Sequence, residues 1–344
     1  MIWYLVPSLL ISVFGIFNIF GIKSSLCLNQ TVYVVVGILF YFLIKKIGRN
    51  FFLQNIQQIY WTLLVILVIT YIIGFEVKGS KRWIDLLFFN FQASEFLKPF
   101  FILFLADLFT RVPKYIDDLQ LFIMSIFYFI LPTFIIFKQP DLGNALVYIF
   151  IYLVMVLFSP VSKKYIVYFL LFVLVSLPFG WFFLRDYQKD RLLAFFNPHI
   201  DTQGTAYNMI QAIVTIGSGR FLGRGLGLGT QSRLFFLPEN RTDFAFASLV
   251  EQFGFLGGFV VIILYLIVIV ACIKKIIGFY FEKSGESSTN FLYVLGFSSY
   301  LFFQVLVNVG MNLGLLPITG IALPFISYGG SSIVALMIGM ALIP

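Results

Sequence analysis

Charged residues are scarce in this sequence, and the side chains most used for structural metal sites are nearly missing. Only 11% of the 344 residues are charged, whereas about 25% is usual for a soluble domain. There is one histidine, His199, and the two cysteines, Cys27 and Cys272, lie far apart and in no motif. These shortages exclude a metal site built from His and Cys, and the two thiols do not indicate a redox compartment.

Hydrophobic residues, by contrast, make up 60% of the chain, above the roughly 45–50% that a soluble domain carries. A chain of this composition could not hide its apolar surface from water. The net charge of +8 would suggest a nucleic-acid partner in a soluble protein. Here most Lys and Arg residues lie between hydrophobic runs, where membrane topology and anionic lipid explain them better. We therefore expect an integral membrane protein in contact with membrane lipid, and no nucleic-acid partner.

About 20 apolar residues cross a bilayer as a helix, and ten stretches of this kind can be read from the sequence. The first begins at Ile2 and has no small-residue cleavage site after it, so it is read as a membrane helix rather than a cleavable signal. The predicted fold is all-α, a single polytopic membrane domain over 1–344 with about ten transmembrane helices. The ten stretches are 2–22, 30–46, 58–75, 95–110, 120–137, 143–159, 164–184, 243–273, 290–311 and 327–343.

Lys and Arg residues in short loops predict the orientation, because they favour the cytoplasmic side. With the N-terminus inside, ten of them lie in short inner loops and five in short outer loops. Both termini are then cytoplasmic, and the long loop 185–243 between the seventh and eighth helices is extracytoplasmic. A connection of nearly sixty residues between membrane helices is unusual and tends to be functional.

The long loop contains a run rich in glycine and arginine, from Gly217 to Ser232. Glycines let a backbone approach a ligand closely, and successive amides can form an anion nest. Arg220, Arg224 and Arg233 add positive charge for phosphate. The spacing is neither a P-loop nor a dinucleotide fingerprint, so no nucleotide is expected. A flexible surface loop would also explain the run.

The long loop ends at Asp243, where the chain re-enters the membrane. Thr242 or Asp243 could simply cap the eighth helix, and the helix dipole would favour an ionised carboxylate there. Alternatively, a carboxylate held beside arginines at the membrane surface could take a proton from a sugar hydroxyl. Glu251 lies eight residues on, about 12 Å deeper on the same helix, where a charge is a functional candidate.

Two further places carry candidate residues, each with an ordinary explanation beside the functional one, and a third place has an ordinary explanation that suffices. Glu95 and Lys98 open the fourth helix on one face and can pair, either in a substrate site or as a helix-end ion pair. Arg82 and Trp83 suit a head-group interface, which an aromatic belt with a snorkelling cation also explains. Asp141 follows a tight turn and can cap the sixth helix.

Six strings of the sequence, taken in order, resemble the SEDS family (shape, elongation, division and sporulation), which comprises the RodA and FtsW proteins. Any one string is weak, but six in register over nearly the whole chain are specific, and details of the long loop look nearer the RodA branch. The strings are Gly79–Asp85 with Gln92–Lys98, Gln139–Gly143, Tyr187–Pro198, Gly217–Ser232, Leu237–Phe246 and Asn308–Ser332.

The resemblance implies a peptidoglycan glycosyltransferase of the bacterial inner membrane. Such enzymes polymerise lipid II, carried on undecaprenyl pyrophosphate, into glycan strands during cell elongation or division. They work with a class B penicillin-binding protein, which is a transpeptidase, and with other proteins of the elongation or division complex. Asp243 matches the family's essential aspartate, and Trp83, Glu95, Lys98 and Arg191 match other motif positions around the proposed substrate cavity.

The expected site follows from this match. Asp243 is the predicted general base, or a ligand of a divalent cation (Mg or Mn) beside the pyrophosphate. The chain departs from the family at Asn240 and Arg241, where histidines are common, and at Gln252. A lipid II flippase, which would need ionisable residues along a path through the bilayer, and a non-catalytic scaffold are the alternatives. The predicted substrate-binding residues are Arg82, Trp83, Glu95, Lys98, Arg191, Arg220, Arg224 and Glu251.

Overall fold

The computed structural model is mostly helical, and it describes residues 2–77, 80–85, 89–111, 116–184, 186–196, 205–282 and 285–344. Within these ranges, six helical segments are long and apolar enough to cross a membrane, which identifies a membrane protein. They are α1 (Ile2–Ile22), α2 (Cys27–Ile47, preceded by the short helix η1, Ser24–Leu26), α4 (Ile56–Ile73), α6 (Asp118–Lys138), α12 (Ala245–Phe281) and α13 (Gly285–Asn312).

Each of the ten predicted stretches overlaps one helix of the structure. Besides those six, the matching helices are α5 (Ala93–Thr110), α7 (Leu142–Leu157), α8 (Lys163–Phe183) and α14 (Gly330–Ala341). That all ten cross the membrane stays a prediction. The loop 185–243 contains further helices, α9 (Asp186–Phe196), α10 (Thr205–Gly219) and α11 (Thr230–Arg233), and α3 (Arg49–Gln54) follows α2.

The strictly all-α expectation was wrong in one place, between α4 and α5. A small antiparallel sheet with the order β1-β2-β3 is formed there by β1 (Phe75–Val77), β2 (Ser80–Asp85) and β3 (Asn90–Phe91). Helix α4 ends because Gly74 takes an extended backbone (φ −59°, ψ 146°). The chain then pairs with itself, and this sheet places residues 80–85 against the bundle, with β2 in contact with both α4 and α5.

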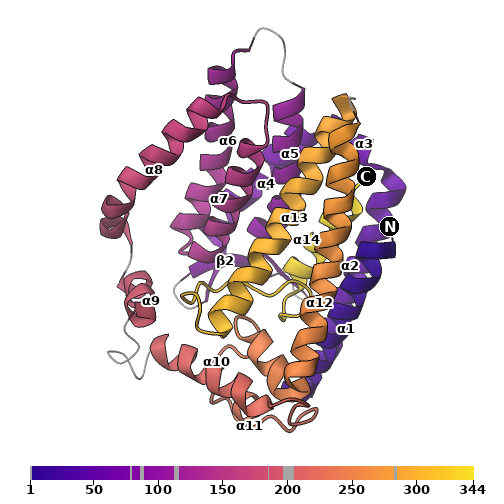
Figure 1. Ribbon diagram of the computed structural model, residues 1–344, viewed down its shortest axis with the longest axis vertical. Coiled ribbons are helices and arrows are strands. Elements are labelled where there is room, and N and C mark those ends of the chain that lie inside the picture. Colours follow the sequence, from indigo (N-terminus) through magenta and orange to yellow (C-terminus); the bar gives the residue numbers. More distant parts are fainter. Residues whose placement is uncertain are drawn as a thin grey trace.

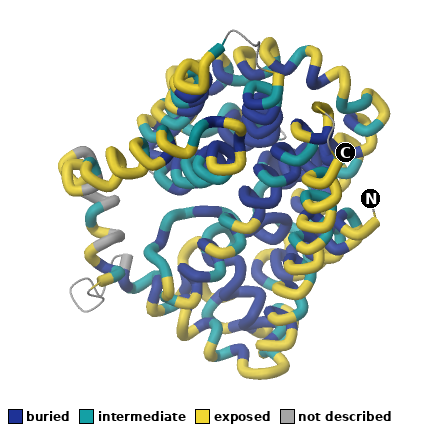
Figure 2. The backbone as a smooth tube through the Cα atoms, turned by 45° about the horizontal axis from the view of Figure 1, so that its top comes forward, coloured by how far each residue is buried: buried dark blue, intermediate teal, exposed yellow. Residues whose placement is uncertain are grey.

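Helix α5 lies at the centre of the bundle. It packs against α4, α13 and α14, and nearly all of its side chains are buried, as expected for a helix that is apolar all round. Helix α8 is the opposite case, because almost its whole described length is exposed. Figure 1 shows α8 standing apart at the left of the bundle, and Figure 2 shows it as an exposed arm beside a buried centre.

Helix α12, which contains most of the predicted apolar stretch 243–273, is interrupted at one residue. Gly254 has non-helical angles (φ 72°, ψ −174°), and the chain after α10 fits into the interruption. The amide of Arg224 donates to the carbonyl of Glu251 (2.8 Å), and the amide of Phe255 donates to the carbonyl of Arg220 (2.8 Å). The loop therefore supplies backbone partners that the broken helix has lost, which satisfies groups that would be costly to bury unpaired.

Candidate functional site

A cavity of about 680 Å³ lies beside the start of α5. Its walls come from β2, the turn between α6 and α7, the segment before α12, and the chain between α13 and α14. Asn208 of α10 also lines it, so the cavity opens at the end of the bundle where Figure 1 shows α10 and α11. Its charged lining residues are Arg82, Glu95, Asp141, Glu239 and Asp243.

Arg82 is held against the turn between α6 and α7. Its Nε donates to the carbonyl of Gln139 (3.3 Å), another guanidinium nitrogen donates to the carbonyl of Pro140, and Nη1 lies 3.6 Å from Oδ1 of Asp141. Asp141 also accepts from the backbone amide of Asn144 (3.2 Å), so the predicted cap of α7 is confirmed. These contacts fix the only cation among the described lining residues of this cavity.

Glu95 and Lys98 form the ion pair that their spacing predicted. Lys98 Nζ lies 2.5 Å from Glu95 Oε1, and both side chains are buried. Nζ also lies 5.2 Å from the ring centre of Tyr300, where a cation is attracted to the aromatic face. Glu95 lines the cavity and Lys98 does not, so the lysine stands behind the carboxylate.

The second oxygen of Glu95 is an open acceptor. Oε2 is buried and has no hydrogen-bond partner within the described part of the chain. A buried acceptor without a partner is costly, by about 1–3 kcal/mol. Because Glu95 is a lining residue, a hydroxyl or amide of a ligand in the cavity would satisfy it.

Asp243 lines the same cavity, together with Thr242 and Glu239. Helix α12 begins at Ala245, and Phe244 occupies its N-cap position. The alternative that Thr242 or Asp243 caps this helix is therefore wrong. Thr242 instead donates from Oγ1 to Oε2 of Glu239 (2.9 Å). Asp243 stands outside the helix at the cavity wall.

Glu251 does not line the cavity. Its fully buried carboxylate accepts hydrogen bonds from the amides of Gln231 (2.8 Å) and Ser232 (2.9 Å) and from the hydroxyl of Ser232. These amides belong to the run for which an anion nest was predicted, and the chain's own carboxylate fills it. The structure makes Glu251 the anchor of the run, while its predicted contact with substrate stays a prediction.

The glycines of this run permit its close packing against α12. A Cβ added at Gly219 would lie 2.2 Å from the carbonyl oxygen of Val250, and one added at Gly223 would lie 2.2 Å from that of Gln252. Both distances are far below van der Waals contact. The run is thus packed against α12 at these glycines, although most of its larger side chains are exposed.

Replacement of Gly223 by alanine is expected to destabilise the protein. Its φ of +87° costs an L-residue roughly 1–2 kcal/mol, and the contact with the Gln252 carbonyl adds to that. Gly217→Ala is the matched control, because nothing lies within 4 Å of the added carbon there. Thermal unfolding in detergent should show a lower Tm for the Gly223 variant alone. Equal Tm values would contradict the packing argument.

Two of the remaining predicted residues, Arg220 and Arg224, lie apart from the cavity. Arg220 and Arg224 are exposed and do not line it, and Nε of Arg224 donates to the carbonyl of Ser218 (2.7 Å). Arg191 belongs to α9, but its side chain lies outside the described residues. The structure therefore brings together Arg82, Trp83, Glu95 and Asp243, with Lys98 directly behind. A contact of the loop arginines with substrate stays a prediction.

Sequence reasoning missed six acidic or amide residues of the cavity wall: Asn90, Gln92, Asp141, Asn144, Asn208 and Glu239. A signal existed for Gln92, Asp141 and Glu239, since all three lie in strings that carry the family resemblance. Capping of α7 was a sufficient explanation for Asp141, so its position in the cavity wall was not predicted. Asn208 lies in α10 and had no distinguishing pattern.

A protein-only metal centre is not present among the residues that the structure describes, where no three His, Cys, Asp or Glu side chains group together. Mg²⁺ is commonly held by one or two carboxylates together with substrate phosphates and water. Asp243 fits that more limited arrangement, because it lines a cavity large enough for a ligand.

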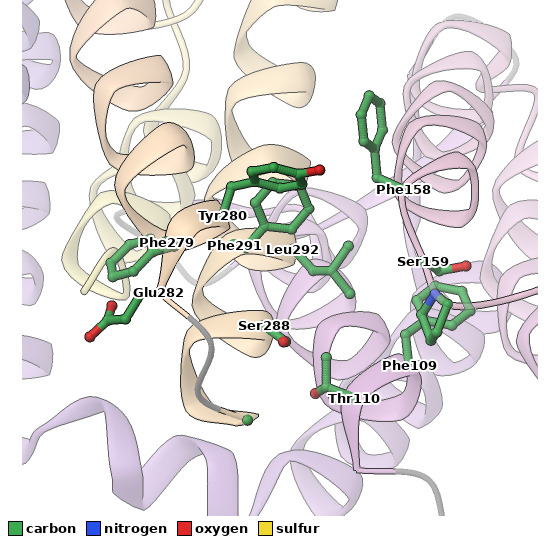
Figure 3. Close-up of a pocket in the computed structure, with 12 residues that line it drawn as sticks. Phe109, Thr110, Phe158, Ser159, Phe279, Tyr280, Glu282, Ser288, Phe291 and Leu292 are labelled. Carbon is green, nitrogen blue, oxygen red and sulfur yellow. The ribbon is translucent and has the colours of Figure 1, made fainter.

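A second cavity, of about 650 Å³, lies at the opposite ends of α5, α7 and α13. Figure 3 shows Thr110 and Ser159 on one side of it and Tyr280 and Phe291 on the other. Among its described lining residues, Glu282 is the only one with a carboxylate. The first cavity, with four carboxylates and an arginine, is the better candidate for acid–base chemistry.

Fold and site together define a class of protein: a helical membrane protein with a polar, carboxylate-lined cavity at one end of its bundle. Its family follows from sequence comparison. The profile of the FtsW, RodA and SpoVE family, described as cell cycle proteins, matches residues 3–344, and the chain belongs to this family.

Several relatives share most of the chain. The peptidoglycan glycosyltransferase MrdB of Helicobacter pylori is 33% identical over 344 residues, which cover 97% of this chain and 86% of that protein. MrdB of Escherichia coli is 34% identical over 288 residues, covering 83% and 75%. The probable peptidoglycan glycosyltransferase FtsW of Hydrogenovibrio crunogenus is 30% identical over 332 residues, covering 94% and 82%. The resemblance seen in the sequence and the enzyme class that it implies are confirmed.

Solved structures agree on the fold. A chain from a peptidoglycan synthase complex, studied for its coordination of polymerization and crosslinking, superposes with a TM-score of 0.82 at 25% identity, covering 99% of this chain and 95% of that one. The rod shape determining protein RodA of Thermus thermophilus gives a TM-score of 0.72 at 24% identity, covering 100% and 95%.

Proposed function

We propose that this protein polymerises lipid II into glycan strands and that Asp243 is its general base. The observation that carries the proposal is the position of Asp243, outside α12 and in the wall of the cavity that also contains Glu95 and Arg82. A positioned carboxylate within reach of a reacting hydroxyl contributes about 10²–10⁴-fold to a rate.

The reaction is a displacement at the anomeric carbon of the donor glycan. The 4-hydroxyl oxygen of the N-acetylglucosamine of lipid II forms the new bond, and its proton passes to a carboxylate oxygen of Asp243. The bond from the anomeric carbon to the pyrophosphate oxygen breaks, and its electron pair leaves with undecaprenyl pyrophosphate. A divalent cation held by Asp243 and the pyrophosphate would supply charge neutralisation.

Arg82 and Glu95 bind and orient the substrates in this scheme. Arg82 is fixed by the turn between α6 and α7, so its charge needs no rearrangement to stabilise the leaving pyrophosphate. Glu95 accepts a hydrogen bond from a sugar hydroxyl or amide through Oε2. Lys98 holds the other oxygen of that carboxylate and thereby sets its orientation.

The cavity end of the bundle is extracytoplasmic in this proposal, the termini are cytoplasmic, and the membrane is the bacterial inner membrane. The distribution of Lys and Arg over the short loops supports it. A class B penicillin-binding protein is the proposed partner, which would crosslink the strands. The fold shared with a chain of a peptidoglycan synthase complex supports such a partnership.

Purified protein with its transpeptidase partner, incubated with lipid II, tests the activity directly. Glycan polymer should form, and reactions with and without Mg²⁺ or Mn²⁺ show whether a cation is needed. A flippase would instead move lipid II across liposomes and make no polymer. The contacts of Glu251 argue against the flippase alternative. Loop amides bind this deep carboxylate, so it does not line an open path for lipid II through the bilayer.

A further inference from the structure

Three consecutive backbone carbonyls that lead into the candidate base are held by one other part of the chain. The carbonyl of Arg241 accepts from the amide of Tyr328 (2.8 Å), and that of Thr242 accepts from the hydroxyl of Ser327 (2.6 Å). The carbonyl of Asp243 accepts from two side-chain amides of α13. The segment from the last turn of α13 to just before α14, residues 308–328, thus contacts the carbonyl of each of residues 241–243.

The two amides on the Asp243 carbonyl come from Asn308 and Asn312, one helical turn apart on α13. Nδ2 of Asn308 lies 2.9 Å from this oxygen, and Nδ2 of Asn312 lies 3.1 Å from it. Both side chains are fully buried. A buried amide without partners costs about 1–3 kcal/mol, so each asparagine is stable in the bundle only while these contacts are made.

Asn312 is inserted into the first turn of α12. In a regular helix the carbonyl of residue 243 would accept from the amide of residue 247. Here Nδ2 of Asn312 donates to the Asp243 carbonyl, and its Oδ1 accepts from the amide of Ala247 (3.0 Å). The side-chain amide of Asn312 therefore bridges the Asp243 carbonyl and the Ala247 amide. Asp243 can lie outside the helix while both of these backbone groups keep a hydrogen-bond partner.

Asn308 connects the same carbonyl to the cavity wall. Its Nδ2 also donates to the carbonyl of Ile321 (2.7 Å), and the neighbouring residues Gly320 and Ala322 line the cavity. Asn312 donates to Asn308 in turn, at its carbonyl (2.8 Å). The pair thus sets the position of residue 243 relative to the opposite wall.

We propose that Asn308 and Asn312 are positioning residues for Asp243, which they hold in register with the cavity. The proposal rests on the function proposed above for Asp243. A base that is misplaced by about 1 Å can lose about 10²-fold in rate. The asparagines touch the backbone of Asp243 and do not line the cavity, so their loss should affect turnover and leave substrate binding intact.

The test is the steady-state kinetics of Asn312→Ala in the purified complex. We expect kcat for lipid II polymerisation to fall about 10–100-fold, while KM changes by less than about threefold. Asn308→Ala, which leaves the insertion of Asn312 in place, should lower kcat about tenfold in the same way. Asn308→Ala also provides the test of the proposal if Asn312→Ala fails to fold.

Asn18→Ala is the matched control. Asn18 is equally buried and also donates to α12, at the carbonyl of Ala245 (3.2 Å), but it does not contact Asp243. It should lower Tm as much as the test variants and leave kcat within about twofold of the parent. An equal loss of kcat in all three variants, or a change in KM alone, overturns the positioning role. Full activity of Asp243→Ala would instead overturn the function on which it rests.

Discussion

Asp243→Asn and Asp243→Ala are both expected to stop lipid II polymerisation, with losses of about 10²–10⁴-fold in rate. The asparagine variant is nearly isosteric, so it keeps the shape of the cavity wall and removes only the ability to accept a proton. The measurement is the rate of glycan polymer formation by the purified complex. Binding of lipid II should persist in both variants, because Arg82 and Glu95 remain in the wall.

Asp118→Asn provides the control for this loss. Asp118 is an exposed aspartate in the first turn of α6, and it does not line the cavity. Its replacement changes the charge by the same amount and should leave the rate unchanged. Polymerisation at the parental rate by Asp243→Asn would rule out proton transfer to Asp243.

The membrane helices could be predicted from the sequence because the signal is local: an apolar run of sufficient length is visible without knowing its neighbours. The strands after Gly74 are short and are stabilised by one another, so no local pattern marked them. The break at Gly254 depends on the chain around Arg224, thirty residues away, which supplies the lost backbone partners. A lone glycine in a helical run does not indicate such a break.

The site residues also divide into those that local spacing could predict and those that depend on contacts with distant parts of the chain. Spacing alone predicted the pair of Glu95 and Lys98, since residues three apart share a helix face. Spacing also placed Glu251 deep on α12, but only the fold shows that loop amides occupy its carboxylate. Asn308 and Asn312 could have been recognised from the sequence as candidate structural residues. Two side-chain amides one turn apart within an apolar helix are costly unless they have defined hydrogen-bond partners.

The ion pair behind the cavity gives the second large effect. Glu95→Gln leaves Lys98 buried without its counter-charge, and breaking a buried pair in this way costs about 3–5 kcal/mol. Tm in detergent should fall strongly, and polymerisation should be lost. Asp107→Asn breaks another ion pair at the other end of α5, with Arg111, which follows the helix and is about half exposed (54%). Such a pair is worth about 0–1 kcal/mol, so this control should change Tm little.

Loss of folding and loss of substrate contact can be separated by removing both charges. Replacing a buried pair by hydrophobic side chains of similar volume is often neutral for stability, so Glu95→Met combined with Lys98→Met should restore Tm. If Glu95 accepts a hydrogen bond from substrate through its open oxygen, the double variant is folded but has no oxygen acceptor at this position. Its affinity for lipid II should then be lower than that of the parent, and polymerisation should stay slow. Recovery of polymerisation together with Tm would show that the pair serves only the stability of the bundle.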